Sequence, residues 1–355
     1  MASASTDRIS VLVTGIGGGG HGEQIIKALR LGTLDYDITG TDMSEACANR
    51  PHVNRFSRLP AARANGYLAA LTDLARTNQC RAIFHGSEPE MMVLSHAKDA
   101  LEGKGFYVPV NPPHVLYICQ DKMRTVRHLA AKGYAVPESH EITAVEDLNA
   151  VRMLPTVLKP SVGGGGSANV FIAQTQSELK LFGRYLLQVY KRFIAQEYVG
   201  TSEQEYTVGV LFGSDGELIN SIAIKRVINN ALTIRTCMPN RTGRAELGKE
   251  LVISTGISQG DIADWAEVRR QCEAIAASLE PRAPVNVQCR LVDGIVVPFE
   301  INPRFSGTTS LRALAGYNEP EILIRRDVFG EDIQRRFPYR KISVLRRLDE
   351  AIVNV

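Results

Sequence analysis

Short hydrophobic strands and amphipathic helices alternate along the first part of the chain. Each strand is a β-branched run bounded by glycine or polar residues, and the segments between them carry apolar positions with a helical period. The strands are expected at residues 9–14, 36–41, 81–85 and 106–108, and the helices at residues 23–31 and 67–77. This alternation predicts a parallel sheet with right-handed crossover connections.

Beyond residue 110 the pattern changes to helices followed by hairpins. Helices are expected at residues 115–119, 122–132, 177–188 and 265–279, and strands at residues 156–160, 169–173, 193–199, 205–212, 218–227 and 231–238, before a last hairpin at residues 288–300. Consecutive strands joined by short turns predict antiparallel pairing. The chain is therefore expected to be an α/β protein whose second part has α+β character.

Composition and charge narrow the class of protein without identifying a partner. With 44% hydrophobic residues, 22% charged residues and a net charge of +3, the chain is typical of globular proteins and shows no bias toward nucleic acid. No apolar run approaches the length of a membrane span, and the polar first residues do not resemble a signal peptide. The six cysteines lack a Cys-x-x-Cys spacing and are typical of reduced thiols. We therefore expect a cytoplasmic protein that binds neither nucleic acid nor membrane.

The last hairpin carries the densest chemistry. Glu300 and Asn302 are two residues apart on the expected strand, so their side chains project from the same face. Carboxylate and amide oxygens of this kind suit Mg²⁺, which keeps few protein ligands and takes the others from phosphates and water. Arg304 follows closely enough to hold the negative charge of a transferred phosphoryl or acyl-phosphate group. The stretch indicates a site for a nucleotide and a metal.

Whether Gln288 joins this site depends on the turn at Asp293-Gly294. A two-residue loop would place Gln288 opposite Phe299, with its side chain on the face away from Glu300. A three-residue loop, with Gly294 left-handed in a bulge, would pair Gln288 with Pro298 instead. That register brings four polar side chains to one face: Gln288, Arg290, Glu300 and Asn302. We predict the bulged three-residue loop.

A first glycine-rich segment covers residues 15–20. It follows a strand and opens a helix with the spacing Gly-x-Gly-x-x-Gly, and Asp42 ends the next strand. The pattern is compatible with a dinucleotide site, as in NAD-dependent dehydrogenases. Glycines at these positions also permit close packing of helix on strand without any ligand. The backbone N–H groups could alternatively bind an anion of a substrate.

A second glycine-rich segment, residues 163–167, follows the strand that contains Lys159. Its glycines supply backbone N–H groups that can fold over a phosphate chain, and Lys159 supplies a positive charge. Lys122 opens a helix against the helix dipole, which indicates an anionic partner. In residues 196–205, Glu197 and Glu205 bracket a turn that could contact adenine through its backbone and ribose through a carboxylate. Taken one by one, these features are equally compatible with a surface hairpin and surface charges.

Taken in order, these motifs resemble the ATP-grasp superfamily. The resemblance is to the synthetase halves of the carbamoyl-phosphate synthase large subunit and to stand-alone carboxylate–amine ligases, over about residues 9–330. It rests on the two lysines, the second glycine segment, the linker, Gln288 and the Glu-x-Asn-Pro-Arg motif that begins at Glu300. It implies a Rossmann-like parallel-sheet domain over residues 1–118, an ATP-grasp small lobe with a glycine-rich lid over residues 119–200, and a large lobe with the metal site and a C-terminal segment over residues 201–355.

The resemblance also implies ATP as a cofactor with Mg²⁺, in two ions for which Mn²⁺ can substitute. The implied binding residues are Lys122 and Lys159 for the phosphates, Gly165, Gly166 and Ser167 for the lid, Glu197 and Val199 for adenine, Glu205 for ribose, and Gln288, Glu300 and Asn302 for Mg²⁺. Arg304 and Lys159 are implied to be catalytic, with Arg304 stabilising the acyl phosphate and its tetrahedral successor.

The implied reaction activates a carboxylic acid as an acyl phosphate and joins it to an amine, releasing ADP and phosphate. Candidate contacts for these two small molecules are Glu88 for the amine, and Arg235, Ser306, Thr308 and Thr309 around the acid. A homodimer is left open. Three alternatives also stay open: phosphorylation of bicarbonate or carbamate, as in carbamoyl-phosphate synthase; a nucleotide-binding regulatory protein without catalysis; and the dehydrogenase. Only one ATP-grasp unit is recognised, which distinguishes the chain from a full carbamoyl-phosphate synthase.

Overall fold

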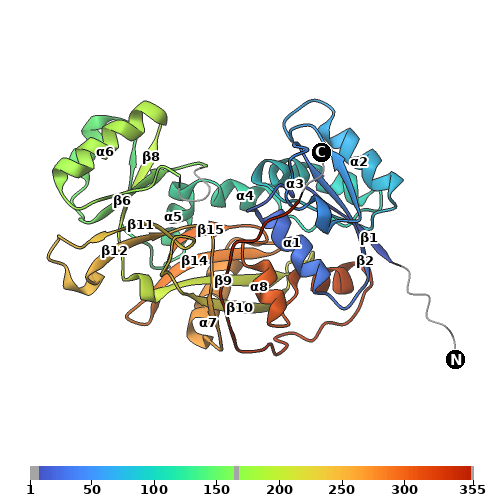
Figure 1. Ribbon diagram of the computed structural model, residues 1–355. Coiled ribbons are helices and arrows are strands. Elements are labelled where there is room, and N and C mark those ends of the chain that lie inside the picture. The colour runs from blue at the N-terminus through green and yellow to red at the C-terminus, as the bar shows by residue number, and fades with distance from the viewer. Residues whose placement is uncertain (1–7, 164–167, 353–355) are drawn as a thin grey trace.

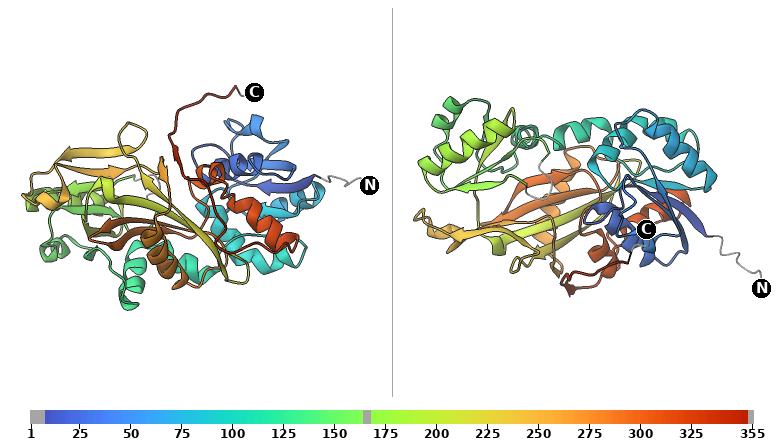
Figure 2. Two further views of the ribbon diagram at one scale, coloured as in Figure 1. Left: turned by 90° about the horizontal axis from the view of Figure 1, so that it is seen from below. Right: turned by 45° about the horizontal axis from the view of Figure 1, so that its top comes forward.

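A computed structural model describes residues 8–163 and 168–352. The predicted combination of a parallel N-terminal sheet and later antiparallel sheets is confirmed. A small lobe that contains helix α6 (Gln176–Val189) and the N-terminal part lie at opposite ends of the molecule, and a six-stranded sheet extends beneath and between them (Figures 1 and 2).

The N-terminal part is a four-stranded parallel sheet. Its strands are β1 (Ile9–Val13), β2 (Tyr36–Asp42), β3 (Arg55–Arg58) and β4 (Ala82–Phe84), in the order β3-β2-β1-β4. Its helices are α1 (His21–Arg30), α2 (Tyr67–Thr77) and α3 (Glu88–Glu102), with the short turn η1 (Arg50–His52). Val11, Leu12 and Val13 are all fully buried because helices cover both faces of the sheet. The stretch expected to close the unit contributes a single parallel bridge, from Tyr107 to Ala82.

Helix α3 was absent from the expected elements. Its start is encoded locally, since the Ser87 side chain accepts a hydrogen bond from the Glu90 backbone N–H and Pro89 lies in the first turn. A serine cap followed by Glu-Pro-Glu is a recognisable helix start. The helix matters for function because it begins with Glu88, one of the candidate substrate contacts.

The small lobe follows two helices that lead out of the N-terminal part. These are α4 (Pro113–Cys119) and α5 (Lys122–Ala131). The lobe itself is an antiparallel sheet in the order β5-β8-β6-β7, formed by β5 (Ser139–Ile142), β6 (Thr156–Pro160), β7 (Phe171–Ala173) and β8 (Phe193–Glu197), with η2 (Val145–Ala150) and helix α6. Leu179 and Leu186 of α6 are buried in one cluster with Leu158 and Phe193 of the sheet. The amphipathic pattern of α6 thus holds it on this lobe.

The six-stranded sheet is antiparallel throughout. Its order is β15-β14-β9-β10-β13-β16, from β9 (Glu205–Phe212), β10 (Leu218–Arg226), β13 (Gly260–Ile262), β14 (Val285–Val292), β15 (Ile295–Asn302) and β16 (Ile342–Val344). Helix α7 (Ala266–Ala277) covers one face through Val268, Cys272 and Ile275. A separate ribbon pairs β11 (Ile234–Pro239) with β12 (Glu250–Ser254). The remaining elements are η4 (Ser202–Gln204), η5 (Ala245–Leu247), α8 (Thr309–Leu314), α9 (Glu319–Leu323) and the π-helical turn η6 (Ile324–Val328).

The N-terminal sheet and the end of the chain share one hydrophobic core. Val11 and Phe84 belong to the same buried cluster as Ile222, Phe305 and Tyr317. This core joins the first predicted domain to the third, and the domain boundaries themselves stay a prediction.

Candidate active site

A cavity of about 500 Å³ lies where the small lobe, the six-stranded sheet and the N-terminal part meet. Its wall includes twelve residues from helices, strands and loops far apart in the sequence: Gly19, Gly20, His21, Glu88, Lys122, Lys159, Glu197, Val199, Glu205, Gln288, Glu300 and Arg304. Most of the residues implied by the ATP-grasp resemblance thus line a single space. The predicted lid residues Gly165, Gly166 and Ser167 lie outside the described residues.

The hairpin of β14 and β15 brings Gln288 opposite Glu300, but not by the predicted turn. Val292 pairs with Ile295, so the loop has two residues, Asp293 and Gly294, both with positive φ. The predicted three-residue loop is therefore wrong. The register shifts further along, where Gln288 pairs with Glu300 and Cys289 with Pro298.

Phe299 is the extra residue of this bulge. Pro298 lacks a backbone N–H and cannot donate to the ladder, which favours an irregularity at this point. The carbonyl of Phe299 accepts a hydrogen bond from Lys159 Nζ at 3.0 Å. The bulge thus has two consequences: Gln288 and Glu300 share the cavity face, and a backbone oxygen is directed to the buried lysine.

The predicted metal ligands supply hard oxygen donors on this face. Gln288 and Glu300 are a partly buried cross-strand pair, and Asn302 is 8% exposed. Within the described ranges, no cluster of three or more His, Cys, Asp and Glu side chains could hold a metal. One carboxylate with neighbouring amides fits Mg²⁺ that takes its remaining ligands from phosphates and water.

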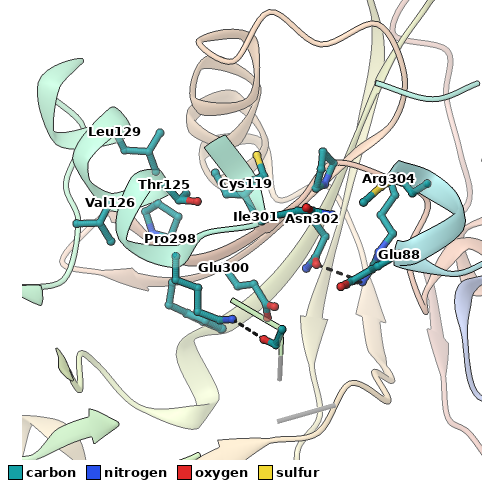
Figure 3. Close-up of a pocket in the computed structure, with 16 residues that line it drawn as sticks. Glu88, Cys119, Thr125, Val126, Leu129, Pro298, Glu300, Ile301, Asn302 and Arg304 are labelled. Atoms are coloured by element: carbon teal, nitrogen blue, oxygen red, sulfur yellow. Dashed lines mark hydrogen bonds and ion pairs between the residues drawn. The ribbon is translucent and has the colours of Figure 1, made fainter. Parts of the chain in front are cut away.

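Arg304 lies between Asn302 and Glu88. Its Nη2 donates to Asn302 Oδ1 at 3.1 Å and to Glu88 Oε1 at 3.3 Å (Figure 3). Its Nη1 donates to the carbonyl of Phe305 at 3.0 Å, and its buried Nε has no hydrogen-bond partner among the described residues. The guanidinium is thus fixed next to the predicted metal ligands, and its Nε–H is still available as a hydrogen-bond donor.

Lys159 is a buried lysine beside Phe299 and Glu300, on the side of the predicted metal ligands away from Arg304. Burial, and then the charge of Lys122, lower the pKa of Lys159 from 10.5 to about 7, against an opposing effect of Glu300. Lys122 lines the cavity and donates from Nζ to the carbonyl of Gly163 at 3.1 Å. A buried lysine whose charged form is disfavoured by burial and by a neighbouring cation is expected where a polyanion later supplies the compensating charge.

Glu205 is fully enclosed by donors. It accepts hydrogen bonds from Arg226 Nη1 at 2.8 Å, from Ser254 Oγ at 2.6 Å, and from Nε and Nη2 of Arg290 at 3.3 and 3.0 Å. Burial raises the pKa of the Glu205 carboxyl, but the charges of Arg226 and Arg290 outweigh it and hold the pKa below its usual range. A carboxylate offers about four acceptor sites, so ribose would have to displace a donor. The ribose role stays a prediction, and the geometry shows Glu205 anchoring two arginines.

Arg290 links that ion cluster to the linker between the lobes. Its Nη1 donates to the carbonyls of Val199 and Gly200 at 3.0 and 3.2 Å, which fixes the linker backbone at the cavity wall. Glu197, at the end of β8, is partly buried and pairs with Arg244 at 3.4 Å. The described contacts therefore use the Val199 carbonyl, and the adenine role of Glu197 and Val199 stays a prediction.

The four candidate acid contacts have different positions. Ser306 and Thr308 line the cavity and their hydroxyl oxygens are 2.6 Å apart. Thr309 is buried behind the wall and donates to Glu319 at 3.1 Å, so its contacts are structural. Arg235 is exposed on β11, outside the cavity lining.

The first glycine segment packs closely and also reaches the cavity. A Cβ on Gly17 would lie 2.7 Å from Asp42 Oδ2, so the carboxylate rests against the turn. Gly19 N–H donates to Glu23 Oε2 at 2.8 Å, while Gly20 and His21 line the cavity. Sequence reasoning had assigned no role to His21 or to Arg226. His21 had a usable signal, since it directly follows the glycine run, whereas Arg226 comes from a strand that pairs with β9 only in three dimensions.

Other expectations concern chemistry outside the cavity. All six cysteines are free; five are buried, and Cys237 is exposed. In the described part of the chain no helix has the length and apolar character needed to cross a membrane.

The comparisons with known proteins assign the family. A family model described as an ATP-grasp domain matches residues 119–308, more than half of the chain. The chain belongs to the ATP-grasp family. The carbamoyl phosphate synthase large chain of Mesorhizobium japonicum is 24% identical over 259 residues, which cover 68% of this chain and 21% of that protein. The match thus spans about a fifth of this relative.

Solved structures of ATP-grasp ligases have the same fold. N5-carboxyaminoimidazole synthetase from Staphylococcus aureus, complexed with ADP, gives a TM-score of 0.65 at 15% identity, covering 94% of this chain and 80% of that chain. L-amino acid ligase from Bacillus licheniformis gives 0.59 at 17% identity, covering 92% and 77%. The biotin carboxylase domain of the Hydrogenobacter thermophilus 2-oxoglutarate carboxylase, in complex with MgADP and bicarbonate, gives 0.60 at 16% identity, covering 93% and 71%. These likenesses show that the chain has the same fold as these three proteins.

Proposed function

We propose that the protein is an ATP-dependent carboxylate–amine ligase that forms an acyl phosphate and then an amide, releasing ADP and phosphate. One observation carries the proposal. A single cavity joins the oxygens of Gln288 and Glu300 to the buried Lys159 and to the guanidinium of Arg304. Phosphoryl transfer between a nucleotide and a carboxylate needs these groups and no side-chain nucleophile.

ATP is expected to lie along the cavity from the linker to Arg304. Val199 N–H and the neighbourhood of Glu197 are the expected adenine contacts, and Lys122 and Lys159 the expected phosphate contacts, with Gly165, Gly166 and Ser167 as the lid. Gln288, Glu300 and Asn302 would hold Mg²⁺, which when bound neutralises the charge of the phosphates. Two ions, and replacement by Mn²⁺, belong to the same proposal.

The proposed reaction has two steps. First, a carboxylate oxygen of the acid attacks the γ-phosphorus, the bond from this phosphorus to ADP breaks, and ADP leaves with the electron pair. Second, the amine attacks the acyl carbon, the carbon–oxygen bond to phosphate breaks, and phosphate leaves while the amine nitrogen loses a proton to solvent or to Glu88. Arg304 would hold the negative oxygens in both steps; its place beside Asn302 and Glu88 in the cavity wall supports this role.

The test is a screen for ADP release over acids and amines, followed by mass analysis of the product. The proposal expects ADP release that depends on both an acid and an amine, and that falls strongly in Glu300→Gln. The control is Glu267→Gln, an exposed position on α7. ADP release from Glu300→Gln at the wild-type rate would overturn the assignment of the metal site.

A second candidate is phosphorylation of bicarbonate or carbamate. It is favoured by one observation, the similarity to the carbamoyl phosphate synthase large chain. It predicts bicarbonate-dependent ADP release without any organic acid, in the same screen. Tight binding of Mg·ATP without ADP release under any condition would instead indicate a regulatory nucleotide-binding protein.

A further inference from the structure

The segment that follows β16 passes the cavity and is anchored there through Arg346. Residues 345–352 lie outside helices and strands, and within this described stretch Arg346 alone is partly buried. In Figures 1 and 2 the segment, in dark red, runs from the edge of the six-stranded sheet to the N-terminal part. Leu345 and Leu348 are 68% and 75% exposed, so apolar packing does not hold the segment in place. Its attachment therefore depends on the contacts of Arg346.

Arg346 binds three segments that are far apart in the sequence. Its Nε donates to the carbonyl of Ser258 at 3.0 Å. Its Nη2 donates to Gln24 Oε1 of α1 at 3.0 Å and also to the carbonyl of Gly307. The backbone N–H of Arg346 adds a hydrogen bond to Gln259 Oε1 at 2.9 Å. One planar guanidinium thus joins α1 to the loop between β12 and β13 (residues 255–259) and to the turn before α8.

All three segments contribute to the wall of the cavity. The wall includes nine of their residues: Gly19, Gly20 and His21 at the start of α1, Gly256, Ile257 and Ser258 between β12 and β13, and Ser306, Gly307 and Thr308 before α8. A Cβ on Gly307 would lie 3.3 Å from the carbonyl oxygen of Gly256, so the loop and the turn are in close contact. Arg346 does not itself line the cavity and holds these wall residues from outside.

The bond to Gly307 is important because this residue separates two predicted acid contacts. Ser306 and Thr308 lie on either side of it, with their hydroxyl oxygens 2.6 Å apart. The Thr308 N–H also donates to Ser306 Oγ at 3.0 Å, which closes a tight turn around the Gly307 peptide. Glycine restricts its own backbone less than any other residue, so the orientation of this turn depends on outside contacts. A guanidinium on the Gly307 carbonyl therefore limits the directions in which the two hydroxyls can face.

The loop between β12 and β13 is held by arginines on two sides. Arg226 Nη2 donates to the carbonyls of Thr255 and Ile257, both at 3.0 Å. Arg346 takes the next carbonyl, that of Ser258. Arg226 belongs to β10 and is fixed by the sheet, whereas Arg346 belongs to a segment that is otherwise exposed. The position of this part of the wall thus depends on the C-terminal segment.

We propose that Arg346 is a positioning residue for the acid: it holds the turn before α8 and the loop between β12 and β13 against α1, and so orients the hydroxyls of Ser306 and Thr308. The inference rests on the proposed function, in which the C-terminal segment has no role. None of the proposed ATP contacts is a partner of Arg346 among the described residues. The acid, and not ATP, should therefore respond to a change of Arg346.

The first test compares Arg346→Ala with Arg347→Ala in the ADP-release assay, with the acid and amine that the screen identifies. Both variants lose one arginine at adjacent positions, but Arg347 is exposed and is the matched control. Arg346→Ala should lower kcat/KM for the acid roughly tenfold to hundredfold through KM, with KM for ATP unchanged. Arg347→Ala should keep the wild-type constants.

Restoring the guanidinium separates its hydrogen bonds from the bulk of the side chain. Guanidinium ion added to Arg346→Ala can occupy the vacated space and donate to the same carbonyls, so part of the lost activity should return. Potassium chloride at the same ionic strength is the control and should restore none. Arg346→Lys keeps the charge without the planar fork and should have an intermediate KM for the acid.

The second test is hydrogen–deuterium exchange of the full chain and does not depend on activity. In Arg346→Ala, residues 255–259 and 306–310 should exchange faster than in the wild type, and guanidinium ion should slow them again. The hairpin of β14 and β15 should exchange as in the wild type, which also shows that the variant is folded. Arg347→Ala should match the wild type throughout.

Failures of the inference and of the proposed function are distinguishable. Unchanged exchange of both segments in Arg346→Ala would overturn the inference, whether or not the chain is a ligase. An equal rise of KM for the acid and for ATP would also overturn it, because the role of Arg346 would then be general. Faster exchange of the two segments, without acid-dependent ADP release by the wild type, would support Arg346 as the anchor of the wall and overturn the ligase.

Discussion

The charge of Lys159 makes ATP binding dependent on pH. Lys159 is 7% exposed, and burial lowers its pKa from 10.5 to about 7. At about 1.36 kcal/mol for each pKa unit, holding this lysine charged in the free protein costs on the order of 5 kcal/mol. The triphosphate would supply the missing negative charge, so the pKa should rise when Mg·ATP binds.

The direction in which the affinity for Mg·ATP changes with pH follows from the difference between the pKa of Lys159 in the free protein and its pKa in the complex. Below about pH 7, Lys159 is charged in both free and bound protein, and the affinity for Mg·ATP is at its maximum and independent of pH. Between this pKa and the higher pKa of the complex, binding takes up a proton, and the affinity falls by up to about tenfold for each pH unit. At pH 8 the affinity should therefore be about a tenth of its maximum.

Titration calorimetry at saturating Mg²⁺, from pH 6.5 to pH 9 and in buffers of different ionisation enthalpy, measures both the affinity and the proton uptake. Lys159→Met should bind Mg·ATP weakly and without this pH dependence. Lys159→Arg keeps its charge and should lose the pH dependence with a smaller loss of affinity. A constant affinity across this range in the wild type, with no proton uptake, would show that Lys159 does not gain a proton when Mg·ATP binds.

Three further predictions concern the cavity wall and the fold. Glu300→Gln should lower ADP release roughly hundredfold or more and weaken its dependence on Mg²⁺, because an amide replaces the carboxylate of the proposed metal site. A Mg²⁺ titration of ADP release measures this effect, and an unchanged titration curve would contradict the prediction. Glu205→Gln should lower the free energy of unfolding by about 3–5 kcal/mol, because two buried arginines lose their counter-charge. Urea unfolding compared with the control Glu267→Gln measures this loss, and equal stability of the two variants would exclude Glu205 as the stabilising counter-charge. Gly86→Ala should lower the free energy of unfolding by at least about 2 kcal/mol, because its Cβ would lie 1.8 Å from the carbonyl oxygen of Thr14. Thermal unfolding measures this loss, and a midpoint equal to that of the wild type would show that the close approach has no energetic role.

The regular elements were predictable because each has a local signal. The helix over residues 67–77 has its predicted bounds, as does strand β9. Helix α3 was not among the predicted elements, although Ser87 caps it and Glu88, predicted only as an amine contact, lies in its first turn. Pairings between distant strands, such as β13 with β16, have no local signal at all.

The prediction that Gln288 and Glu300 share one face of the hairpin is confirmed, but the predicted three-residue turn is wrong. Gln288 shares the face of Glu300 because Phe299 is bulged, whereas the sequence favoured a bulge at Gly294. Both arrangements insert one residue into the hairpin, and hydrophobic alternation cannot distinguish between them. The contact from Lys159 to the Phe299 carbonyl belongs to tertiary structure and could not be foreseen from the strand alone.

The role of Glu205 shows the same limit. A carboxylate in a linker was a reasonable ribose contact, but Glu205 lies on β9 and binds Arg226 and Arg290, which come from β10 and β14, the strands on either side of β9. Their charges become relevant only once the sheet order is known. Arg235 was placed near the acid by its residue type, and its exposure on β11 separates it from the cavity.

In the proposed reaction, the acid is activated through its own carboxylate oxygen. Once an acid substrate has been found by the screen, its carboxylate is labelled with a heavy oxygen isotope and the released phosphate is analysed by mass spectrometry. One labelled oxygen should be transferred to phosphate for each amide formed, because the carbon–oxygen bond of the acyl phosphate breaks in the second step. Amide formation with unlabelled phosphate would contradict it.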